Sequence, residues 1–431
     1  MVKKAGITLL GLGPGDVGQL TRQAWSWLQN CRQVVLRTRQ HPCVAEFPTN
    51  LEVLTFDELY ENGESFEEVY EQITRRVLEL GQRPEGATYA VPGHPFVAES
   101  TGPEIARRAK EMGIPVRVIE GLSFIEPVCS ALGIDPFPHL TLVDALELGR
   151  LHTPSFPPDQ PALIAQIYNR QTAAEVKLAL EQVYPDEHPV RLVHAAGTPG
   201  EKVEDLKLFE IDRSRKIGLL TVLYLPPLES DTSFERFQEI IARLRAPDGC
   251  PWDRQQTHAT LRRHLLEETY EALSAIDAES ANEMREELGD LLLQIVLHAQ
   301  IAVEEGEFSM AEVLQGITRK LVRRHPHVFG EVEVGGVKDV LKNWEQIKGE
   351  ERKEKGKGQA EEKGLLDGVP REFPALAQAM ELSERAARVG FEWESIAGVW
   401  DKIREELEEV RAAKTPDNQI EEIGDLLFVV V

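Results

Sequence analysis

The chain has 431 residues, of which 48 are Lys or Arg and 73 are Asp or Glu, giving a formal net charge of −25. This length exceeds one hydrophobic core and predicts several domains, while the negative charge argues against general binding to nucleic acid or to anionic membranes. The four cysteines lack a CxxC pair and no apolar run reaches the length of a membrane span. Free thiols and the lack of a secretory start predict a cytoplasmic protein.

Short β-rich runs alternate with helical stretches over residues 5–227. Such alternation is typical of an α/β fold with a largely parallel sheet. The predicted strands span residues 7–10, 88–91, 116–119, 163–168, 190–194 and 219–225.

A glycine-rich turn, Gly11-Leu12-Gly13-Pro14-Gly15-Asp16, separates the first strand from a helical pattern that runs from Leu20 to Cys31. Glycines at a strand-to-helix turn let the backbone approach a ligand closely. The turn lacks the spacing of the dinucleotide fingerprint, and no Gly-Lys-Ser/Thr follows it as in a P-loop. By itself the turn is therefore a weak signal.

Further loop motifs accompany this turn in a fixed order. They are residues 91–100 (VPGHPFVAES), 119–124 (IEGLSF), 168–170 (YNR) and 194–200 (HAAGTPG). Together with the turn they resemble the tetrapyrrole (corrin/porphyrin) methylase family, in which two α/β subdomains enclose S-adenosylmethionine. The resemblance implies cofactor-binding roles for Pro14, Gly93, His94, Phe96, Val97, Ser123, Phe124, Tyr168, Ala195 and Thr198.

One position departs from the family's pattern, because its usual Gly-Asp-Pro is Gly93-His94-Pro95 here. The methyl acceptor is not readable from the residues. A domain that keeps the fold, and with it the cofactor, as a sensor or scaffold is the alternative to a methyltransferase.

An acidic pattern occurs twice in the C-terminal half. Glu268 and Glu271 lie on one face of a predicted helix, and Glu287 and Asp290 lie on one face of the next. If the helices pack together, four carboxylates converge and need a cation. Oxygen ligands select Mg²⁺, or Mn²⁺. Solvated acidic faces are the ordinary alternative, but the recurrence of the whole pattern among apolar residues favours a metal site in the first copy.

Residues 234–348 read as helical throughout and are similar to the MazG-type nucleoside triphosphate pyrophosphohydrolases, an all-α family. The similarity lies in residues 250–253 (CPWD), 256–258 (QTH), 265–271, 287–290, 320–329 (KLVRRHPHVF) and 343–345 (NWE). It implies hydrolysis of nucleoside triphosphates to a nucleoside monophosphate and pyrophosphate.

The remaining roles follow from residue types within this resemblance. Glu267 points about 100° away from the neighbouring ligand and suits a general base or an orienting group. Binding of a triphosphate also requires cationic side chains to contact its phosphates. Trp344 either stacks on the base or belongs to the hydrophobic core. The candidate substrate-binding residues are Lys320, Arg323, Arg324, Trp344 and Lys348.

The second copy of the pattern keeps Glu406, Glu409, Glu422 and Asp425 but has no basic helix after it. We expect this incomplete repeat to be structural or inactive, as in a truncated product, unless a partner subunit completes it. A charged, glycine-bearing segment, residues 349–364, precedes it and predicts a flexible linker.

The predicted protein is therefore multidomain, with a two-subdomain α/β methylase-like part and an all-α MazG-like helical bundle. The predicted domains are 1–229 (methylase-like), 230–348 (MazG-like), 349–364 (linker) and 365–431 (partial second repeat). Apolar residues beyond those that a short bundle can cover, such as Leu293, Ile295, Val296 and Ile301, predict a homodimer. A non-catalytic sensor with a dimerising helical part is the alternative function.

Overall fold

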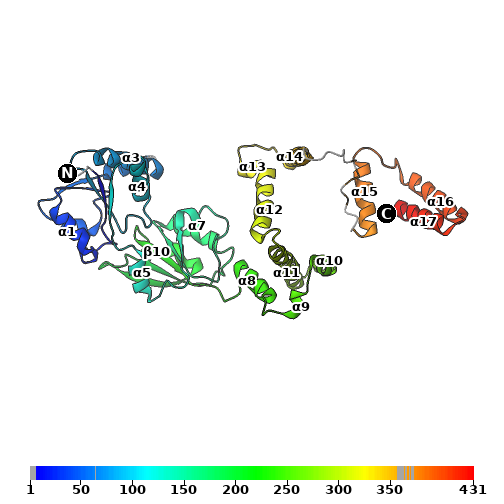
Figure 1. Cartoon of the computed structure of the whole chain (residues 1–431), viewed down its shortest axis with the longest axis horizontal. Helices are drawn as coiled ribbons and strands as arrows, with labels where there is room; N and C mark the ends of the chain where they lie inside the picture. The colour runs from blue at the N-terminus through cyan, green and yellow to red at the C-terminus, as the bar shows by residue number, and fades with distance from the viewer. Residues whose placement is uncertain (1–5, 64, 357–363, 365, 368, 370–372) are drawn as a thin grey trace. The chain divides into compact units, whose positions relative to one another are not determined.

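The computed structural model describes residues 6–63, 65–356, 364, 366–367, 369 and 373–431 (Figure 1). The chain divides into two compact units, Met1–Ile301 and Ala302–Val431, and the boundary falls within the long helix α11 (Ala281–Glu305). No helix among the described residues has the length and hydropathy needed to cross a membrane.

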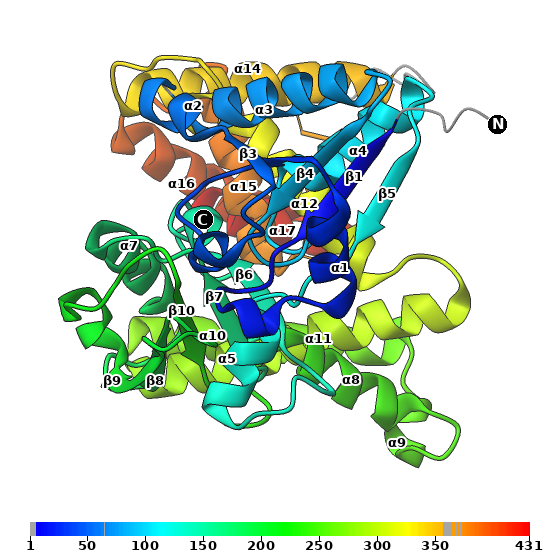
Figure 2. The same ribbon diagram turned by 90° about the vertical axis from the view of Figure 1, so that its left-hand side faces the viewer.

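The first sheet is wholly parallel and is covered by helices on both faces (Figure 2). Its order is β3-β2-β4-β1-β5, with β1 Ile7–Gly11, β2 Gln33–Leu36, β3 Glu52–Thr55, β4 Ala87–Val91 and β5 Val116–Ile119. The helices are α1 Arg22–Asn30, α2 Asp57–Asn62, α3 Phe66–Gly81 and α4 Thr101–Glu111. Leu9 packs with Ile73 of α3 and Ile105 of α4, whereas Leu10 packs with Leu28 of α1. Burial on both faces explains why these strands are continuous apolar runs.

The second sheet mixes strand directions. Its order is β6-β7-β10-β8-β9, with β6 Thr141–Asp144, β7 Ala162–Ala165, β8 Pro189–His194, β9 Lys202–Lys207 and β10 Thr221–Leu225. Only the β6–β7 pair is parallel; β10 pairs antiparallel with β7 and β8, and β8 with β9. The helices are α5 Ile125–Leu132, α6 Ala145–Leu148 and α7 Arg170–Leu180. Val176 of α7 packs with Ile164, and Val128 of α5 packs with Leu163, so these helices cover opposite faces.

From Phe234 onward the described residues form helices and their connections, which confirms the predicted all-α part. The first unit contains α8 Phe234–Arg245, α9 Pro251–Arg254, α10 His258–Asp277 and most of α11. Side chains of Ser233 and Thr257 cap α8 and α10 by accepting from backbone N–H groups at 3.1 and 3.2 Å. Ile241 of α8 packs with Leu261 of α10 and Val296 of α11 in one apolar cluster.

This cluster corrects part of the reasoning that led to a dimer. Val296 and Ile301 are buried against α8 and α10 within the chain, and Leu293 packs against the same cluster. Of the apolar positions named for an outside partner, Ile295 remains exposed. The sequence pattern gave no sign that α8 would fold back over these residues.

The second unit holds α12 Met310–Arg324, α13 Pro326–Phe329, α14 Val337–Gly356, α15 Ala375–Ala387, α16 Ile396–Ala412 and α17 Pro416–Val430. Helix α14 continues through the first part of the predicted linker, to Gly356. Within this extension Glu350 accepts from the Gln346 amide one turn earlier, and Glu351 pairs with Arg324 of α12. Most of the remaining linker, 357–363, lies outside the described residues.

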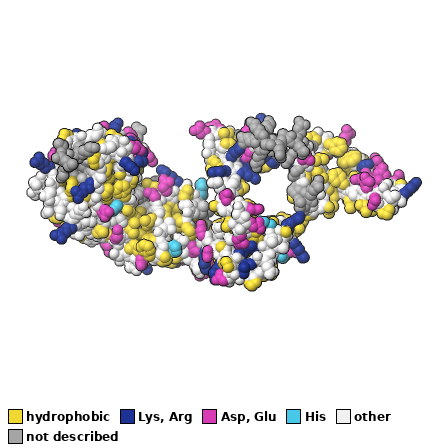
Figure 3. Space-filling model, in the orientation of Figure 1, with side chains coloured by type: hydrophobic (Ala, Val, Ile, Leu, Met, Phe, Trp, Pro, Cys, Tyr) yellow, Lys and Arg dark blue, Asp and Glu magenta, His cyan; other side chains and the backbone are white. Residues whose placement is uncertain are grey.

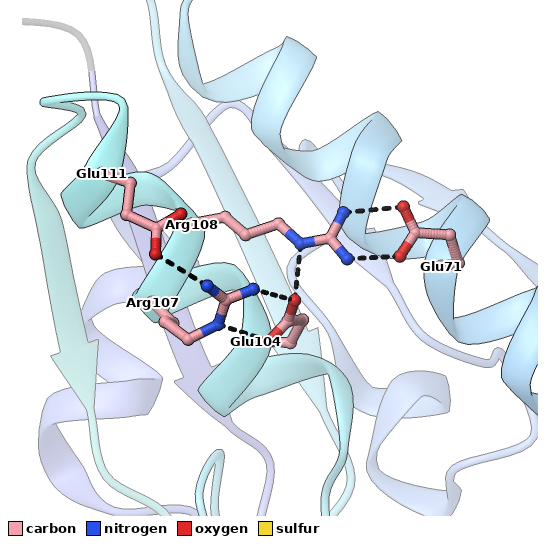
Figure 4. Close-up of polar contacts among 5 residues, drawn as sticks. All are labelled: Glu71, Glu104, Arg107, Arg108 and Glu111. Carbon is pink, nitrogen blue, oxygen red and sulfur yellow. Dashed lines mark hydrogen bonds and ion pairs between the residues drawn. The ribbon is translucent and has the colours of Figure 1, made fainter.

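An exposed ion-pair network ties α4 to α3 (Figure 4). The Arg108 guanidinium donates two bonds to Glu71, at 2.7 and 2.5 Å, and one to Glu104 at 2.5 Å. Arg107 bridges Glu104 and Glu111. Hydrogen bonds from Arg107 and Arg108 lower the pKa of Glu104 to about 2. Because these side chains are solvated, the network contributes little to stability.

A second network is buried beside β2 and β4. Arg37, directly after β2, pairs with Glu99 and donates to the hydroxyls of Tyr60 and Tyr70 at 2.8 and 3.0 Å. The Glu99 carboxylate also accepts from the backbone N–H of Thr101 at 3.0 Å. Burial disfavours the charged guanidinium, yet Glu99 holds the pKa of Arg37 above its ordinary value. The pair is thus a buried charge pair with satisfied hydrogen bonds.

Replacing Glu99 by Ala should lower the free energy of unfolding of this region by about 3–5 kcal/mol, because it leaves the Arg37 charge buried without its partner. Native-state hydrogen exchange of the β1 and β4 amides measures this locally in the full chain. Glu104→Ala, which breaks only the exposed network, is the matched control and should change exchange far less. Equal effects of the two substitutions would contradict the importance of burial.

Candidate functional site

The first acidic pattern converges where α10 and α11 meet. One carboxylate oxygen from each of Glu268, Glu271 and Glu287 lies within 4.8 Å of the others. The spacing of three residues brings Glu268 and Glu271 to one face of α10, and α11 supplies Glu287. Grouped carboxylate oxygens are a ligand set for a hard divalent cation.

The charges in this cluster act on one another. Burial, followed by the charges of Asp290, Glu271 and Glu287, raises the pKa of Glu268. Burial, followed by Glu271 and Asp290, also raises the pKa of Glu287. Asp290 therefore belongs to the cluster electrostatically. Raised pKa values mean that ionising all the acids is unfavourable without a cation, so protons and a metal ion compete for this site.

Glu267 makes its own ion pairs on α10. Its carboxylate accepts from Arg263 Nε at 2.6 Å and lies 3.3 Å from His264 Nδ1. The hydrogen bond from Arg263 lowers the pKa of Glu267. A proton-accepting or orienting role would require a change in this ion pair.

The second acidic pattern converges in the same way on α16 and α17. Glu406, Glu409 and Glu422 place oxygens within 4.8 Å of one another, and burial with the charges of Glu409 and Asp425 raises the pKa of Glu422. Lys402 Nζ lies 2.8 Å from Glu406 Oε1. The residue four positions before the first ligand is thus a lysine in this copy and His264 in the other.

The predicted substrate-binding residues lie in the second unit. Arg324 pairs with Glu351 at 2.5 Å, and its guanidinium carbon lies 5.4 Å from the centre of the Trp344 ring. Lys348 Nζ lies 4.5 Å from the same ring. Trp344 is half-buried between these cations. Lys320 and Arg323 are exposed on α12, where Arg323 lies 3.9 Å from Glu351.

The glycine-rich loops of the first sheet are joined through their backbones. Gly13 N–H donates to Gly93 O at 3.2 Å and Gly93 N–H donates to Gly13 O at 2.7 Å. Both glycines have positive φ, 71° and 69°, which other residues rarely adopt. A Cβ on Gly15 would lie 2.5 Å from Thr198 Cγ2, so the turn after β1 touches the loop after β8 in the second sheet.

Other predicted cofactor residues flank these loops. Ser123 Oγ donates to Glu126 at 2.6 Å, the Phe96 N–H donates to His94 Nδ1 at 3.1 Å, and the Tyr168 hydroxyl donates to Gln166 at 2.7 Å. Gln166 and Ala195 have positive φ, 69° and 48°. Backbone strain of this kind clusters at functional sites. Pro14, Val97 and Phe124 are partly buried, and Phe124 packs against the apolar cluster around Val128.

A cavity of about 300 Å³ lies next to these loops. None of the predicted cofactor residues lines it, although Leu122 and Gly197 adjoin Ser123 and Thr198. The lining residues are Gln19, Leu122, Glu126, Pro127, Ser130, Ala131, Gly197 and Glu201.

Sequence reasoning missed the buried polar network around Arg37 at the carboxyl end of β2. Arg37 lies directly after β2 and donates to the hydroxyls of Tyr60 on α2 and Tyr70 on α3. Burial raises the pKa of Tyr168. The available signal was a lone arginine directly after an apolar strand, which the chain's many other arginines obscure.

Comparisons with known proteins match both parts of the chain. The family model for tetrapyrrole (corrin/porphyrin) methylases matches residues 6–212, and the model for the MazG nucleotide pyrophosphohydrolase domain matches residues 256–329.

One curated relative matches across both parts of the chain, and others match less than half of it. The uncharacterized protein YabN of Bacillus subtilis is 42% identical over 383 residues, which cover 88% of this chain and 76% of YabN. The nucleoside triphosphate pyrophosphohydrolase/pyrophosphatase MazG of Thermotoga maritima is 45% identical over 203 residues, 47% of this chain and 76% of that protein. The nucleoside triphosphate pyrophosphohydrolase of Escherichia coli K12 is 46% identical over 203 residues, 46% of this chain and 75% of that protein. The chain therefore belongs to the family that joins a tetrapyrrole methylase domain to a MazG nucleotide pyrophosphohydrolase domain.

Proposed function

We propose that the helical half hydrolyses nucleoside triphosphates to a nucleoside monophosphate and pyrophosphate with Mg²⁺, for which Mn²⁺ can substitute. The observation that carries this proposal is the convergence of Glu268, Glu271 and Glu287 within the region matched by the MazG model. The pyrophosphohydrolases of Thermotoga maritima and Escherichia coli, similar over this half, support it.

The acids of α10 and α11 would hold the metal: Glu268, Glu271, Glu287 and Asp290. When bound, Mg²⁺ neutralises phosphate oxygens and acidifies water. Glu267 would accept or direct the proton of the attacking water, after its ion pair with Arg263 rearranges. In this proposal Glu268 and Glu271 lie on one face of α10, and Glu267 is the adjacent residue on the same helix.

Cations of the second unit would bind the triphosphate. Lys320 and Arg323, which are exposed on α12, would pair with phosphate oxygens, and Arg324 would exchange part of its contact with Glu351 for phosphate. Trp344, flanked by Arg324 and Lys348, offers an aromatic face to a base.

Replacing Glu271 by Gln or Asp290 by Asn should abolish pyrophosphate release from a panel of nucleoside triphosphates with Mg²⁺, because each removes a charged oxygen ligand. Glu409→Gln and Asp425→Asn make the same change in the second repeat and should leave activity nearly intact. Loss of activity from both sets would contradict the assignment of the first repeat as the working site.

For the N-terminal half we propose binding of S-adenosylmethionine by the loops at the carboxyl ends of the strands, and methyl transfer from it. The match to the methylase model and the positive φ values of Gly13, Gly93 and Ala195 support a cofactor cleft there. Methyl transfer requires mainly positioning of the sulfonium opposite a nucleophile. The substitution of His94 for the family's usual acid favours a sensor as the second candidate.

Gly93→Val should weaken binding of S-adenosylmethionine, because valine disfavours the φ of 69° at that position and adds bulk beside the cofactor. Calorimetry on the wild-type chain should give a dissociation constant in the micromolar range, about −8 kcal/mol. Gly113→Val is a control, since Gly113 also has positive φ but lies in the turn after α4. Failure of the wild-type chain to bind would reduce the domain to a scaffold.

We also propose that the chain forms a C2 homodimer through its first repeats. Helix α10 exposes Leu266, Tyr270, Leu273 and Ile276, and α11 exposes Met284, Leu288, Leu292 and Ile295. Spacings of three and four residues make each set a stripe along its helix. Apolar side chains are also exposed on the C-terminal helices (Figure 3). The second copy is the proposed occupant of the α10 and α11 stripes.

Light scattering on the full chain should give the mass of a dimer. Leu273→Glu with Ile276→Glu should give a monomer, because buried glutamates at the interface cost more than the apolar contacts they replace. Ile420→Glu with Ile423→Glu on α17 is the matched control and should leave the dimer intact. The opposite pattern would show that the second repeat supplies the interface.

The proposed domains are 1–229, 230–348 and the partial repeat 365–431, in a cytoplasmic protein that binds neither nucleic acid nor membrane. The net charge of −25 and four unpaired cysteines support this location and partner set.

A further inference from the structure

His41 lies in the segment between β2 and β3, outside the loops assigned to the cofactor. Its side chain is buried, with 7% exposure, and its Nε2 lies 2.9 Å from the carbonyl oxygen of Gly13. The same oxygen accepts from the Gly93 N–H at 2.7 Å. Two donors therefore fix one carbonyl at the junction of the glycine-rich loops.

The hydrogen-bond partners of His41 determine which nitrogen of its imidazole carries the proton. A carbonyl can only accept, so Nε2 carries the proton and Nδ1 carries the lone pair. Nδ1 lies 3.0 Å from Cys43 Sγ, and the thiol is the donor in that contact. Burial lowers the pKa of His41 and raises that of Cys43 to about 12, so the neutral imidazole and the thiol are the stable pair.

We propose that Cys43, His41 and Gly13 form a hydrogen-bonded relay that sets the position of the glycine-rich loops for the cofactor. The Cys43 thiol selects the imidazole tautomer, and His41 Nε2–H holds the Gly13 carbonyl in the orientation that also accepts from Gly93. His41 is a positioning residue, since it acts through the backbone of Gly13. This relay rests on the proposed binding of S-adenosylmethionine.

Simple core packing does not account for a histidine and a cysteine at these positions. A core position needs only an apolar group of similar volume, yet here a buried imidazole has both nitrogens engaged. Gly13 has a φ of 71° and cannot be fixed by a side chain of its own. The segment after β2 therefore supplies the constraint that glycine lacks.

Binding of S-adenosylhomocysteine by the full chain tests the relay. His41→Phe keeps a planar aromatic ring but removes the donor, and should weaken binding about tenfold, the contribution of one well-placed hydrogen bond. His41→Gln retains a donor near the Nε2 position and should restore binding close to the wild-type value. Cys43→Ser keeps the donor and should also bind normally, whereas Cys43→Val should bind more weakly.

A double-mutant cycle separates the relay from simple packing. In the His41→Phe background, Cys43→Val should cause no further loss, because the thiol acts only through the imidazole. Independent, additive losses would overturn the relay, as would wild-type affinity in His41→Phe.

Hydrogen exchange of the Gly93 amide gives a readout without cofactor, and exchange should be faster in His41→Phe than in wild type. Unchanged exchange would overturn the positioning role. Failure of the wild-type chain to bind S-adenosylhomocysteine would overturn the proposed cofactor instead, so the two failures are distinguishable.

Discussion

Repulsion among grouped carboxylates is the constraint on which the helical half depends. One oxygen from each of Glu268, Glu271 and Glu287 lies within 4.8 Å of the others, and burial together with the neighbouring charges raises the pKa values of Glu268 and Glu287. The two helices α10 and α11 can stay packed only if other contacts offset this repulsion. The apolar cluster of Ile241, Leu261 and Val296 does so from the side, with α8 as the third member. Packing free energy is thereby used to assemble a site that only a cation makes favourable.

The N-terminal half positions its site by backbone geometry instead of charge. Gly13 and Gly93 exchange hydrogen bonds at positive φ, and Gly15 makes room for Thr198 from the second sheet. Glycine positions have no side chain to anchor them, so such loops are precise only when their surroundings fix them. His41 and the buried Arg37–Glu99 pair provide such fixed groups at the same edge of the sheet.

The two acidic repeats show how similar motifs acquire different surroundings. Both bring three glutamates to one point, but Lys402 pairs with Glu406 in the second copy, while His264 in the first contacts Glu267. In the second copy an ammonium group already lies beside the first acid. Local electrostatics can thus differ although the carboxylate pattern is retained.

The sequence by itself determined the fold classes, six of the ten strands described in the N-terminal half and the faces on which the acids lie, because apolar period and glycine position are local properties. The pattern did not predict the four strands β2, β3, β6 and β9. Strand β7 ends at Ala165 and not at Tyr168, since Gln166 turns to positive φ, which a residue pattern does not reveal. Family resemblance, and not periodicity, pointed to the cofactor loops.

Only the tertiary structure decided which distant groups meet. The burial of Val296 and Ile301 under α8, the pairing of Arg37 with Glu99, and the contact of His41 with Gly13 join residues that no local pattern links. Glu351, in the part of α14 that extends past the predicted helical region, likewise meets Arg324 from another helix. The physical reason is the same in each case. The free energies of burial and of ion pairing depend on which distant residues the fold brings into contact, and the sequence alone does not show those contacts.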